Sequence, residues 1–401
     1  MDGNLKLGSY GYTGSNAVNL QRDLQVFQKG GILRADRWHI KRNLFVIFVS
    51  VLMVVSGTIN TLSTKWADTI TAKGTNPKPE HPFLHPYVQT LGMFIGEASC
   101  IVVFEILYYY YKWVKKDVTR FGSQKFSPLI FAIPAFCDVI GTSTMYVGLT
   151  LTFASSFQML RGAVIIFTAL LSVAFFGSKL RMYHWVGMSA VVIGLIVVGL
   201  GDVIGGDNSG DSRSVLTGDL LIVAAQIIAA IQMTVEQYFV QGLNVPPLQG
   251  VGWEGIFGLC FVGIGLVPMY FIPWHLPAVP DFWQDHTRFE DTIDAFHQIF
   301  YSPTLTVAFL GTVVSIVFFN YAGLSVTKEA SATTRMVLDS VRTLFIWIFG
   351  LIVVWQKFNI FQPIGFSFLV IGAFIYYDVI FWLMKKLHVW PSFCGVPDGE
   401  E

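Results

Sequence analysis

The amino-acid sequence predicts an all-α polytopic membrane protein of ten transmembrane helices, arranged as two inverted repeats of five helices. Hydrophobic residues make up 53% of the 401-residue chain and charged residues only 13%, about half the usual charged share of a soluble domain. The apolar residues gather in runs long enough to cross a bilayer, which takes about 20 helical residues. The second half of the chain also repeats the pattern of the first half. These three observations define the fold class.

The apolar runs are continuous and lack the alternation of membrane β-strands, so they predict helices rather than a barrel. We expect helices near residues 43–63, 86–111, 127–149, 153–176, 183–203, 217–240, 250–272, 304–326, 331–354 and 360–384.

The internal repeat appears when residues 146–196 are laid on residues 321–374 with one shift of register, which places Arg161 on Asp339. Five crossings is an odd number, so the second copy is expected to lie upside down in the bilayer. Inverted repeats are typical of alternating-access transporters, which hold their solute near the midplane where the repeats meet. The expected parts are an N-terminal tail (1–42), a first repeat (43–204), a second repeat (217–386) and a C-terminal tail (387–401).

Basic residues predict the orientation. With a cytosolic N-terminus, most lysines and arginines that flank the predicted helices fall on the cytosolic side, so both termini are expected in the cytosol. The polar first 42 residues and the lack of a cleavage site after the first apolar run predict an uncleaved anchor. The formal net charge is zero, so no nucleic-acid partner is expected and the lipid bilayer is the main surroundings.

The long outer loop, residues 274–302, contains an amphipathic stretch. Its apolar residues recur at helical spacing, with acidic residues opposite. They are Phe282, Phe289, Ile293, Phe296 and Phe300. One interpretation is a helix on the membrane surface or packed over the helix ends. The other is a lid over a transport path.

Ionisable residues inside the predicted helices are the main candidates for a solute site, because each costs at least ~2.5 kcal/mol in a bilayer without a partner or water. Arg335, Asp339 and Arg342 share one face of the ninth helix. The repeat places Arg161 and the nearby Gln158 opposite them. One hypothesis is a cavity with surplus positive charge, since guanidinium groups bind phosphate and carboxylate. The alternative is a set of ion pairs that hold helices together or form a gate.

Further polar residues lie inside other helices. Glu97 and Asp138 are candidate proton-coupling residues, because burial favours the neutral form of a carboxyl group. Pairing with a neighbouring helix is the alternative. Asn60 and Gln232 occupy matching places in the first and sixth helices. They suit either the wall of a polar cavity or interhelical hydrogen bonds.

Two other features are interpreted as structural. Glu236 and Glu254, near predicted helix ends, are expected to anchor those ends at the interface. His81 and His85 have a metal-like spacing, but no third ligand lies nearby in the sequence, so we interpret them as part of a loop before a helix. The sequence has no phosphate-binding loop, nucleophile elbow or metalloprotease helix. Neither an enzyme nor a bound cofactor is therefore expected.

Several longer motifs resemble a known family. They are residues 57–62 (GTINTL), 66–68 (WAD), 154–162 (ASSFQMLRG) and 327–342 (TKEASATTRMVLDSVR). With these motifs, the chain from about residue 43 to 386 resembles solute carrier family 35 of the drug/metabolite transporter superfamily, and more distantly the chloroquine-resistance transporters of parasite vacuoles. The resemblance implies the ten-helix drug/metabolite transporter fold, alternating access and an endomembrane location such as a lysosome or vacuole. It does not identify the solute or decide between a monomer and a homodimer.

The sequence thus predicts a secondary transporter that carries a small polar, anionic metabolite, of which a nucleotide sugar is one example, across an endomembrane. The alternative within transport is a proton-coupled exporter of cationic or peptide-like solutes, in which Asp339, Glu97 and Asp138 matter more than the arginines. The rival from another class is a non-transporting scaffold that binds a protein partner through its tail or through residues 274–302.

Overall fold

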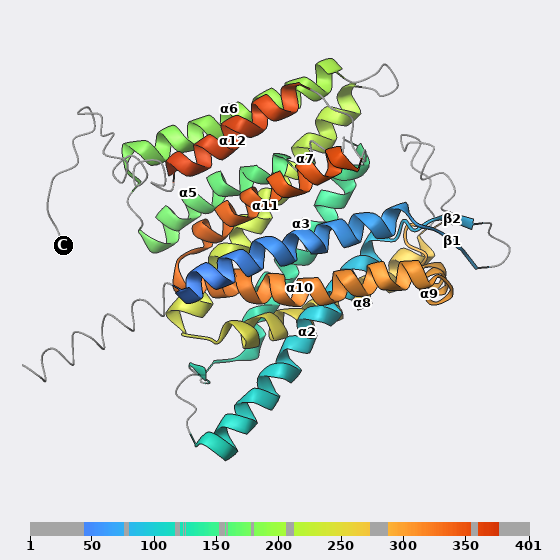
Figure 1. Cartoon of the computed structure of the whole chain (residues 1–401), viewed down its shortest axis with the longest axis vertical. Coiled ribbons are helices and arrows are strands. Elements are labelled where there is room, and N and C mark those ends of the chain that lie inside the picture. The colour runs from blue at the N-terminus through green and yellow to red at the C-terminus, as the bar shows by residue number, and fades with distance from the viewer. Residues whose placement is uncertain are drawn as a thin grey trace, which may run out of the picture. The chain divides into compact units, whose positions relative to one another are not determined.

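The computed structural model describes residues 44–75, 80–116, 121–122, 124, 126–151, 157, 159–177, 180–205, 212–272, 288–353 and 360–376. Within these residues the chain is predominantly helical (Figure 1), which confirms an all-α polytopic membrane protein. The chain divides into a short unit, Met1–Phe48, and a large unit, Val49–Glu401. Of the short unit, the structure describes the first turn of a helix, and the large unit holds all the packing discussed below.

Among the described residues, six helices are long and apolar enough to cross a membrane: Leu44–Thr69, Pro86–Lys115, Pro128–Gly148, Val215–Gly242, Pro247–Phe271 and Pro303–Glu329. Three shorter apolar helices are Arg161–Phe176, Met182–Val198 and Phe361–Tyr376. A further helix, Ala332–Ile352, carries Arg335, Asp339 and Arg342. The predicted apolar runs thus coincide with helices, while their number of membrane crossings stays a prediction.

The labelled elements have these bounds: β1 (Thr71–Lys73), β2 (Glu80–Pro82), α2 (Pro86–Tyr110), α3 (Ala132–Leu151), α5 (Val164–Phe176), α6 (Met182–Gly205), α7 (Ser212–Gln237), α8 (Pro247–Phe271), α9 (Thr292–Tyr301), α10 (Pro303–Glu329), α11 (Ala332–Ile352) and α12 (Phe361–Tyr376). Pro128–Phe131 and Arg161–Ala163 are 3₁₀ turns before α3 and α5, and Tyr111–Lys115 and Tyr238–Gly242 are π-helical turns after α2 and α7. β1 and β2 pair antiparallel, with Ala72 opposite His81.

Local sequence explains several helix ends. Proline occupies the first turn of α2, α8 and α10, where its missing N–H has no helical partner to lose. Ser302 and Ser331 cap α10 and α11 by accepting hydrogen bonds from the backbone N–H groups of Leu305 and Thr334. Gly177 ends α5 with a φ of 63°, a left-handed conformation that glycine adopts without steric cost.

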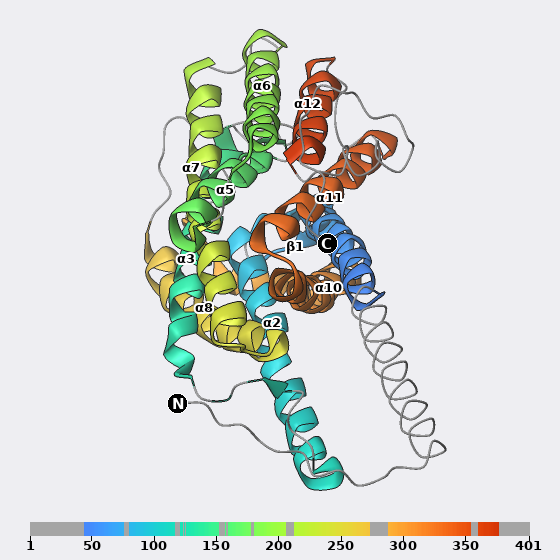
Figure 2. The same ribbon diagram turned by 90° about the vertical axis from the view of Figure 1, so that its left-hand side faces the viewer.

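Three helix pairs make the most extensive contacts: α6 with α12, α3 with α7, and α2 with α8. α6 and α12 run side by side in both views (Figures 1 and 2). The helix Leu44–Thr69 lies along α10, where Asn60 Nδ2 donates to the backbone oxygen of Thr312 at 3.1 Å. Many apolar side chains on the outer faces of these helices are exposed, as expected for surfaces that contact lipid.

Glycines bring α6 and α12 into backbone contact. A Cβ atom at Gly187 would lie 2.7 Å from the carbonyl oxygen of Gly372, and one at Gly194 would lie 2.7 Å from that of Gly365. Real Cβ atoms do not approach a carbonyl oxygen so closely. Small residues at helix interfaces allow this kind of close packing inside membranes.

Part of the predicted amphipathic segment 274–302 is described. α9 is capped by Asp291, which accepts from the backbone N–H of Asp294. Its buried face packs on Ala67, Phe83 and the start of α10, so α9 covers the ends of neighbouring helices, in agreement with the first interpretation. Residues 274–287 lie outside the described residues, as do both tails, and the lid hypothesis stays untested.

The contact between α6 and α12 can be tested with one added methyl group. Gly372→Ala should lower the free energy of unfolding by about 1–3 kcal/mol, because its Cβ overlaps the backbone of α6. Gly263→Ala on α8 is the matched control, since nothing lies within 4 Å of that position. Thermal unfolding of both variants in detergent measures the difference, and equal midpoints would contradict the packing.

Candidate functional site

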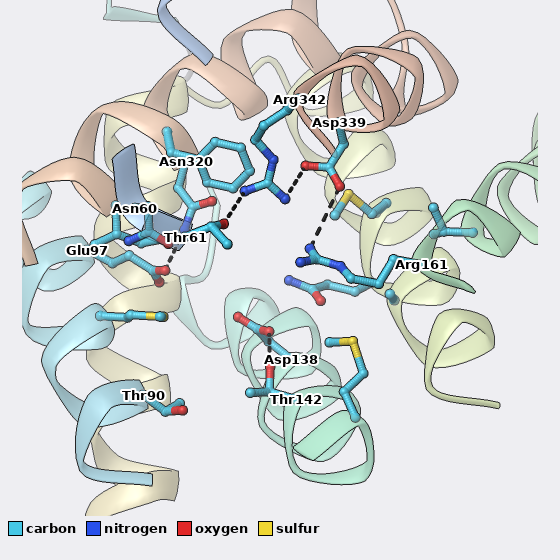
Figure 3. A pocket seen from close by; sticks show the side chains of 18 of the residues that line it. Asn60, Thr61, Thr90, Glu97, Asp138, Thr142, Arg161, Asn320, Asp339 and Arg342 are labelled. Carbon is cyan, nitrogen blue, oxygen red and sulfur yellow. Dashed lines mark hydrogen bonds and ion pairs between the residues drawn. The ribbon is translucent and has the colours of Figure 1, made fainter. Parts of the chain in front are cut away.

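A cavity of about 340 Å³ lies among the helix Leu44–Thr69, α2, α3, α7, α8, α10 and α11 (Figure 3). Its volume falls within the range of small-molecule sites, roughly 300–1,000 Å³. Eight of the residues selected from the sequence line it: Asn60, Glu97, Asp138, Arg161, Gln232, Arg335, Asp339 and Arg342. The ninth, Gln158, lies outside the described residues.

Asp339 lies between two arginines. Its Oδ1 atom is 2.7 Å from Nη2 of Arg342, one turn further along α11, and its Oδ2 atom is 3.7 Å from Nη2 of Arg161 on the 3₁₀ turn before α5. Figure 3 shows Asp339 joined by dashed lines to both Arg342 and Arg161. The convergence of Arg161 and Asp339, expected from the repeat, is present.

Arg342 is held by the first helix as well as by Asp339. Its Nη1 atom donates to the backbone oxygen of Gly57 at 3.1 Å and to Oγ1 of Thr61 at 3.2 Å. The guanidinium group also lies over the ring of Phe319, 4.8 Å from its centroid. A Cβ atom at Gly57 would lie 2.6 Å from Cδ of Arg342. Gly57 therefore makes room for the arginine, a role that sequence reasoning did not assign to the GTINTL motif.

Arg335, one turn before Asp339, pairs with a different helix. Its Nη1 atom lies 2.5 Å from Oε2 of Glu236, and both side chains are buried. The guanidinium group packs against Gly323 of α10, where a Cβ would lie 2.7 Å from Nε. The prediction that Glu236 anchors a helix end at the interface is wrong. α7 continues beyond it as the π-helical turn Tyr238–Gly242, so Glu236 lies inside the bundle.

The prediction for Glu254 is wrong for the same reason. α8 begins at Pro247, which places Glu254 two turns inside the helix, where its side chain is buried against the cavity. The amide nitrogen of Gln232 donates to Oε1 of Glu254 at 2.9 Å and to Oε1 of Glu236 at 3.0 Å. One amide thus connects two acidic side chains on neighbouring helices.

The other cavity carboxylates also receive hydrogen bonds from uncharged groups. Asn320 Nδ2 donates to Oε1 of Glu97, and Oγ1 of Thr142 donates to Oδ1 of Asp138 at 3.1 Å. Among the contacts of the described residues, Glu97, Asp138 and Glu254 each have such a donor and no direct ion pair. When ionised, these three acids have no cationic side chain in direct contact among the described residues.

The whole wall contains more acids than bases. Its basic residues are Lys65, Arg161, Arg335 and Arg342, and its acidic residues are Asp68, Glu97, Asp138, Glu236, Glu254 and Asp339. This count does not give the net charge, because a buried acid can be neutral, so the hypothesis of a surplus of positive charge stays a prediction. It counted the charges of α11 and Arg161, but it treated Glu236 and Glu254 as interfacial and left out Asp68.

The two amides selected from the sequence both hold helices together while lining the cavity. Asn60 Nδ2 bonds Thr312 and, at 3.3 Å, Oγ of Ser315 on α10. Gln232 connects α7 with α8 through Glu254. Both interpretations offered for this pair thus describe part of what these amides do, and neither nitrogen is wholly free for a solute.

Comparison with known proteins agrees with this architecture. The sequence model of solute carrier family 35 matches residues 42–279. The chain is 50% identical to solute carrier family 35 member F6 of Homo sapiens over 333 residues. This alignment covers 83% of the chain and 88% of the human protein. The chain belongs to solute carrier family 35. This membership indicates a transporter rather than an enzyme.

More distant relatives also match most of this chain. An uncharacterized protein of Schizosaccharomyces pombe is 32% identical over 340 residues, which covers 83% of this chain and 98% of the yeast protein. A crystal structure with 13% sequence identity superposes with a TM-score of 0.53, covering 82% of this chain and 98% of that one. At that identity the match shows a shared fold alone.

The buried pair between Arg335 and Glu236 can be tested by unfolding. Glu236→Ala should destabilise this family member by about 3–5 kcal/mol, because it leaves a buried guanidinium group without its partner. The double variant Arg335→Met/Glu236→Leu removes both charges and should recover much of that loss. Equal instability of the single and double variants, measured by chemical denaturation in micelles, would show that the pair is not the cause.

Proposed function

We propose that this chain is a secondary transporter that moves a small polar solute across an endomembrane by alternating access, with the central cavity as its solute site. Family membership supports transport in general. The cavity supports this site in particular, because ionisable side chains at this depth are costly unless they pair or face a hydrated space. The endomembrane location, in a lysosome or vacuole with both termini in the cytosol, follows from the resemblance and from the basic flanks.

Rocking of two inverted repeats is the proposed mechanism, and the packing of the helices supports it. The repeat alignment relates α6 to α12 and Gly187 to Gly365, with Gly194 related to Gly372. The contacts cross over: Gly187 meets Gly372, and Gly194 meets Gly365. Reciprocal contact of this kind is what a two-fold axis between equivalent elements produces. α2 and α8 also pack together, and their sequences are related by a constant shift that places Pro86, Gln89, Gly92 and Cys100 on Pro246, Gln249, Gly252 and Cys260.

The charges of the cavity favour a solute with a cationic group, coupled to protons. Glu97, Asp138 and Glu254, held only by uncharged donors, are the observation that carries this proposal. A buried carboxylate without a cation must take up a proton or bind a positive group. A solute amine and a proton can therefore compete for the same acids, which is a direct means of coupling their movements.

The arginines that line the cavity add a second requirement for the solute. Arg161 is the loosest member of its group, with its nearest carboxylate oxygen 3.7 Å away and its side chain 25% exposed. A solute carboxylate can approach it with little loss of existing contacts. A small peptide-like zwitterion can place its amine near the acids and its carboxylate near Arg161, and so contact both kinds of group. A purely anionic metabolite would contact the arginines alone.

The proposal is tested by counterflow in proteoliposomes with an imposed pH gradient. The panel contains dipeptides, small amines and nucleotide sugars, so that it separates zwitterionic, cationic and anionic solutes. We expect uptake of a zwitterion or amine that rises with the gradient. Glu97→Gln should reduce that stimulation by at least about fivefold, the lower end of typical coupling between sites. Arg161→Ala should weaken uptake of the zwitterion more than that of a simple amine.

Glu105→Gln is the matched control, because Glu105 belongs to the same helix α2 but does not line the cavity. Uptake of nucleotide sugars that ignores the pH gradient would favour the anionic alternative. No uptake of any solute by folded, reconstituted protein would favour the scaffold, whose partner would then be sought at the tail or at residues 274–302.

A further inference from the structure

A second polar cluster lies apart from the cavity, at the end of the bundle that carries β1, β2 and α9. His81 belongs to β2, His85 is the N-cap of α2, and Asp294 belongs to the first turn of α9. One ligand atom from each of the three lies within 4.8 Å of the others. His85 and Asp294 are fully buried, and His81 keeps 13% of its side chain exposed.

The two imidazoles face the same carboxylate oxygen. Oδ2 of Asp294 is 2.8 Å from Nε2 of His81 and 3.8 Å from Nε2 of His85. Ligands around tetrahedral zinc, with bonds of about 2.0–2.1 Å, lie about 3.3 Å from one another. One of the two observed distances is shorter than that value and the other is longer. A change of about half an ångström in each would give the separation expected between zinc ligands.

The remaining atoms of the cluster are already held by neighbours. Nδ1 of His85 is 2.6 Å from Oε1 of Glu290. The other oxygen of Glu290, Oε2, accepts a hydrogen bond from the backbone N–H of Tyr87 at 3.3 Å. Oδ1 of Asp294 accepts from the backbone N–H and hydroxyl of Thr75, at 2.6 and 2.9 Å. A carboxylate behind a histidine and a fixed carboxylate rotamer are the usual supports of metal-ligand groups.

The chemistry of the converging atoms suits a metal ion. Glu290 accepts a hydrogen bond from Nδ1 of His85 when that nitrogen carries the proton, and the lone pair on Nε2 then faces the oxygen of Asp294. Two imidazole nitrogens and a carboxylate oxygen that converge in this way form a donor set suited to a metal ion. Nitrogen ligands from histidine favour a transition metal over Ca²⁺ or Mg²⁺.

We propose that His81, His85 and Asp294 bind a Zn²⁺ ion, with Glu290 and Thr75 orienting the ligands and a water molecule in the fourth position. Three protein ligands with an open position are typical of zinc sites that exchange a ligand. The partial exposure of His81 provides the entry path. The interpretation of His81 and His85 as a simple loop rested on the lack of a third ligand, and the fold supplies one from 213 residues further along the chain.

The bound ion would join two distant parts of the chain. His81 and His85 precede α2, whereas Asp294 lies in α9, directly before α10. Zinc would hold the hairpin of β1 and β2 against α9 and so fix the ends of α2 and α10 relative to each other. The site is independent of the proposed solute, and its occupancy is measurable without a transport assay.

The test is zinc binding by the purified, tag-free full-length protein in detergent after treatment with a chelator. We expect one zinc ion per chain after dialysis against Zn²⁺, measured by elemental mass spectrometry. Co²⁺ in its place should give the visible absorption of a tetrahedral site. His81→Ala and Asp294→Asn should abolish both signals, and Glu290→Gln should weaken zinc binding by about 10–100-fold.

His297→Ala is the matched control, because His297 lies on the same helix but, among the described residues, contacts the backbone oxygen of Lys73 and the ring of Tyr301 rather than the cluster. Asp294→Asn keeps an oxygen that accepts from Thr75, so it separates loss of the metal from loss of folding, which gel filtration verifies. Wild-type protein that takes up no stoichiometric zinc, or zinc retained by His81→Ala, would overturn the proposal and leave a cluster balanced by protons.

Discussion

The structure depends on one constraint: each charged side chain inside an apolar bundle must be compensated by a nearby group. Asp339 meets this need for Arg342 and Arg161, and Glu236 meets it for Arg335. These contacts join α11 to the 3₁₀ turn before α5 and to α7, while Arg342 also bonds the first helix. The ion pairs therefore connect elements that come from both halves of the sequence. A transporter that rearranges these halves must exchange such contacts rather than simply lose them.

Glycine makes this compensation sterically feasible. The side chains of Arg342 and Arg335 lie against Gly57 and Gly323, where a Cβ atom would overlap Cδ of Arg342 and the guanidinium group of Arg335. Elsewhere glycines bring α6 and α12 into backbone contact. Glycine therefore has two uses in this family member: it makes room for buried cations near the cavity, and it allows apolar helices to pack closely further away. Both uses rely on the absence of a side chain, and backbone flexibility is not required for either.

The cavity and the histidine cluster both contain buried carboxylates, but different groups surround these carboxylates in the two places. In the cavity, uncharged donors hold Glu97, Asp138 and Glu254, so a proton or a mobile cationic solute suits the remaining charge. At the end of the bundle, imidazole nitrogens converge on Asp294, so a fixed metal ion suits it. The first arrangement permits exchange and the second favours retention. Under the two proposals, solute handling and mechanical linkage would occur at different places in the bundle.

The sequence by itself determined the membrane class, the helix positions and eight of the residues that line the cavity, because long apolar runs and isolated charges within them carry physical costs that only a few structures meet. Only the tertiary structure decided the partners. Glu236 and Glu254 are near the ends of the predicted helices, but both side chains are buried inside the bundle. Asp294 contacts His81 from a distant helix. Partner choice depends on which faces of separate helices meet, and periodicity within one helix does not contain that information.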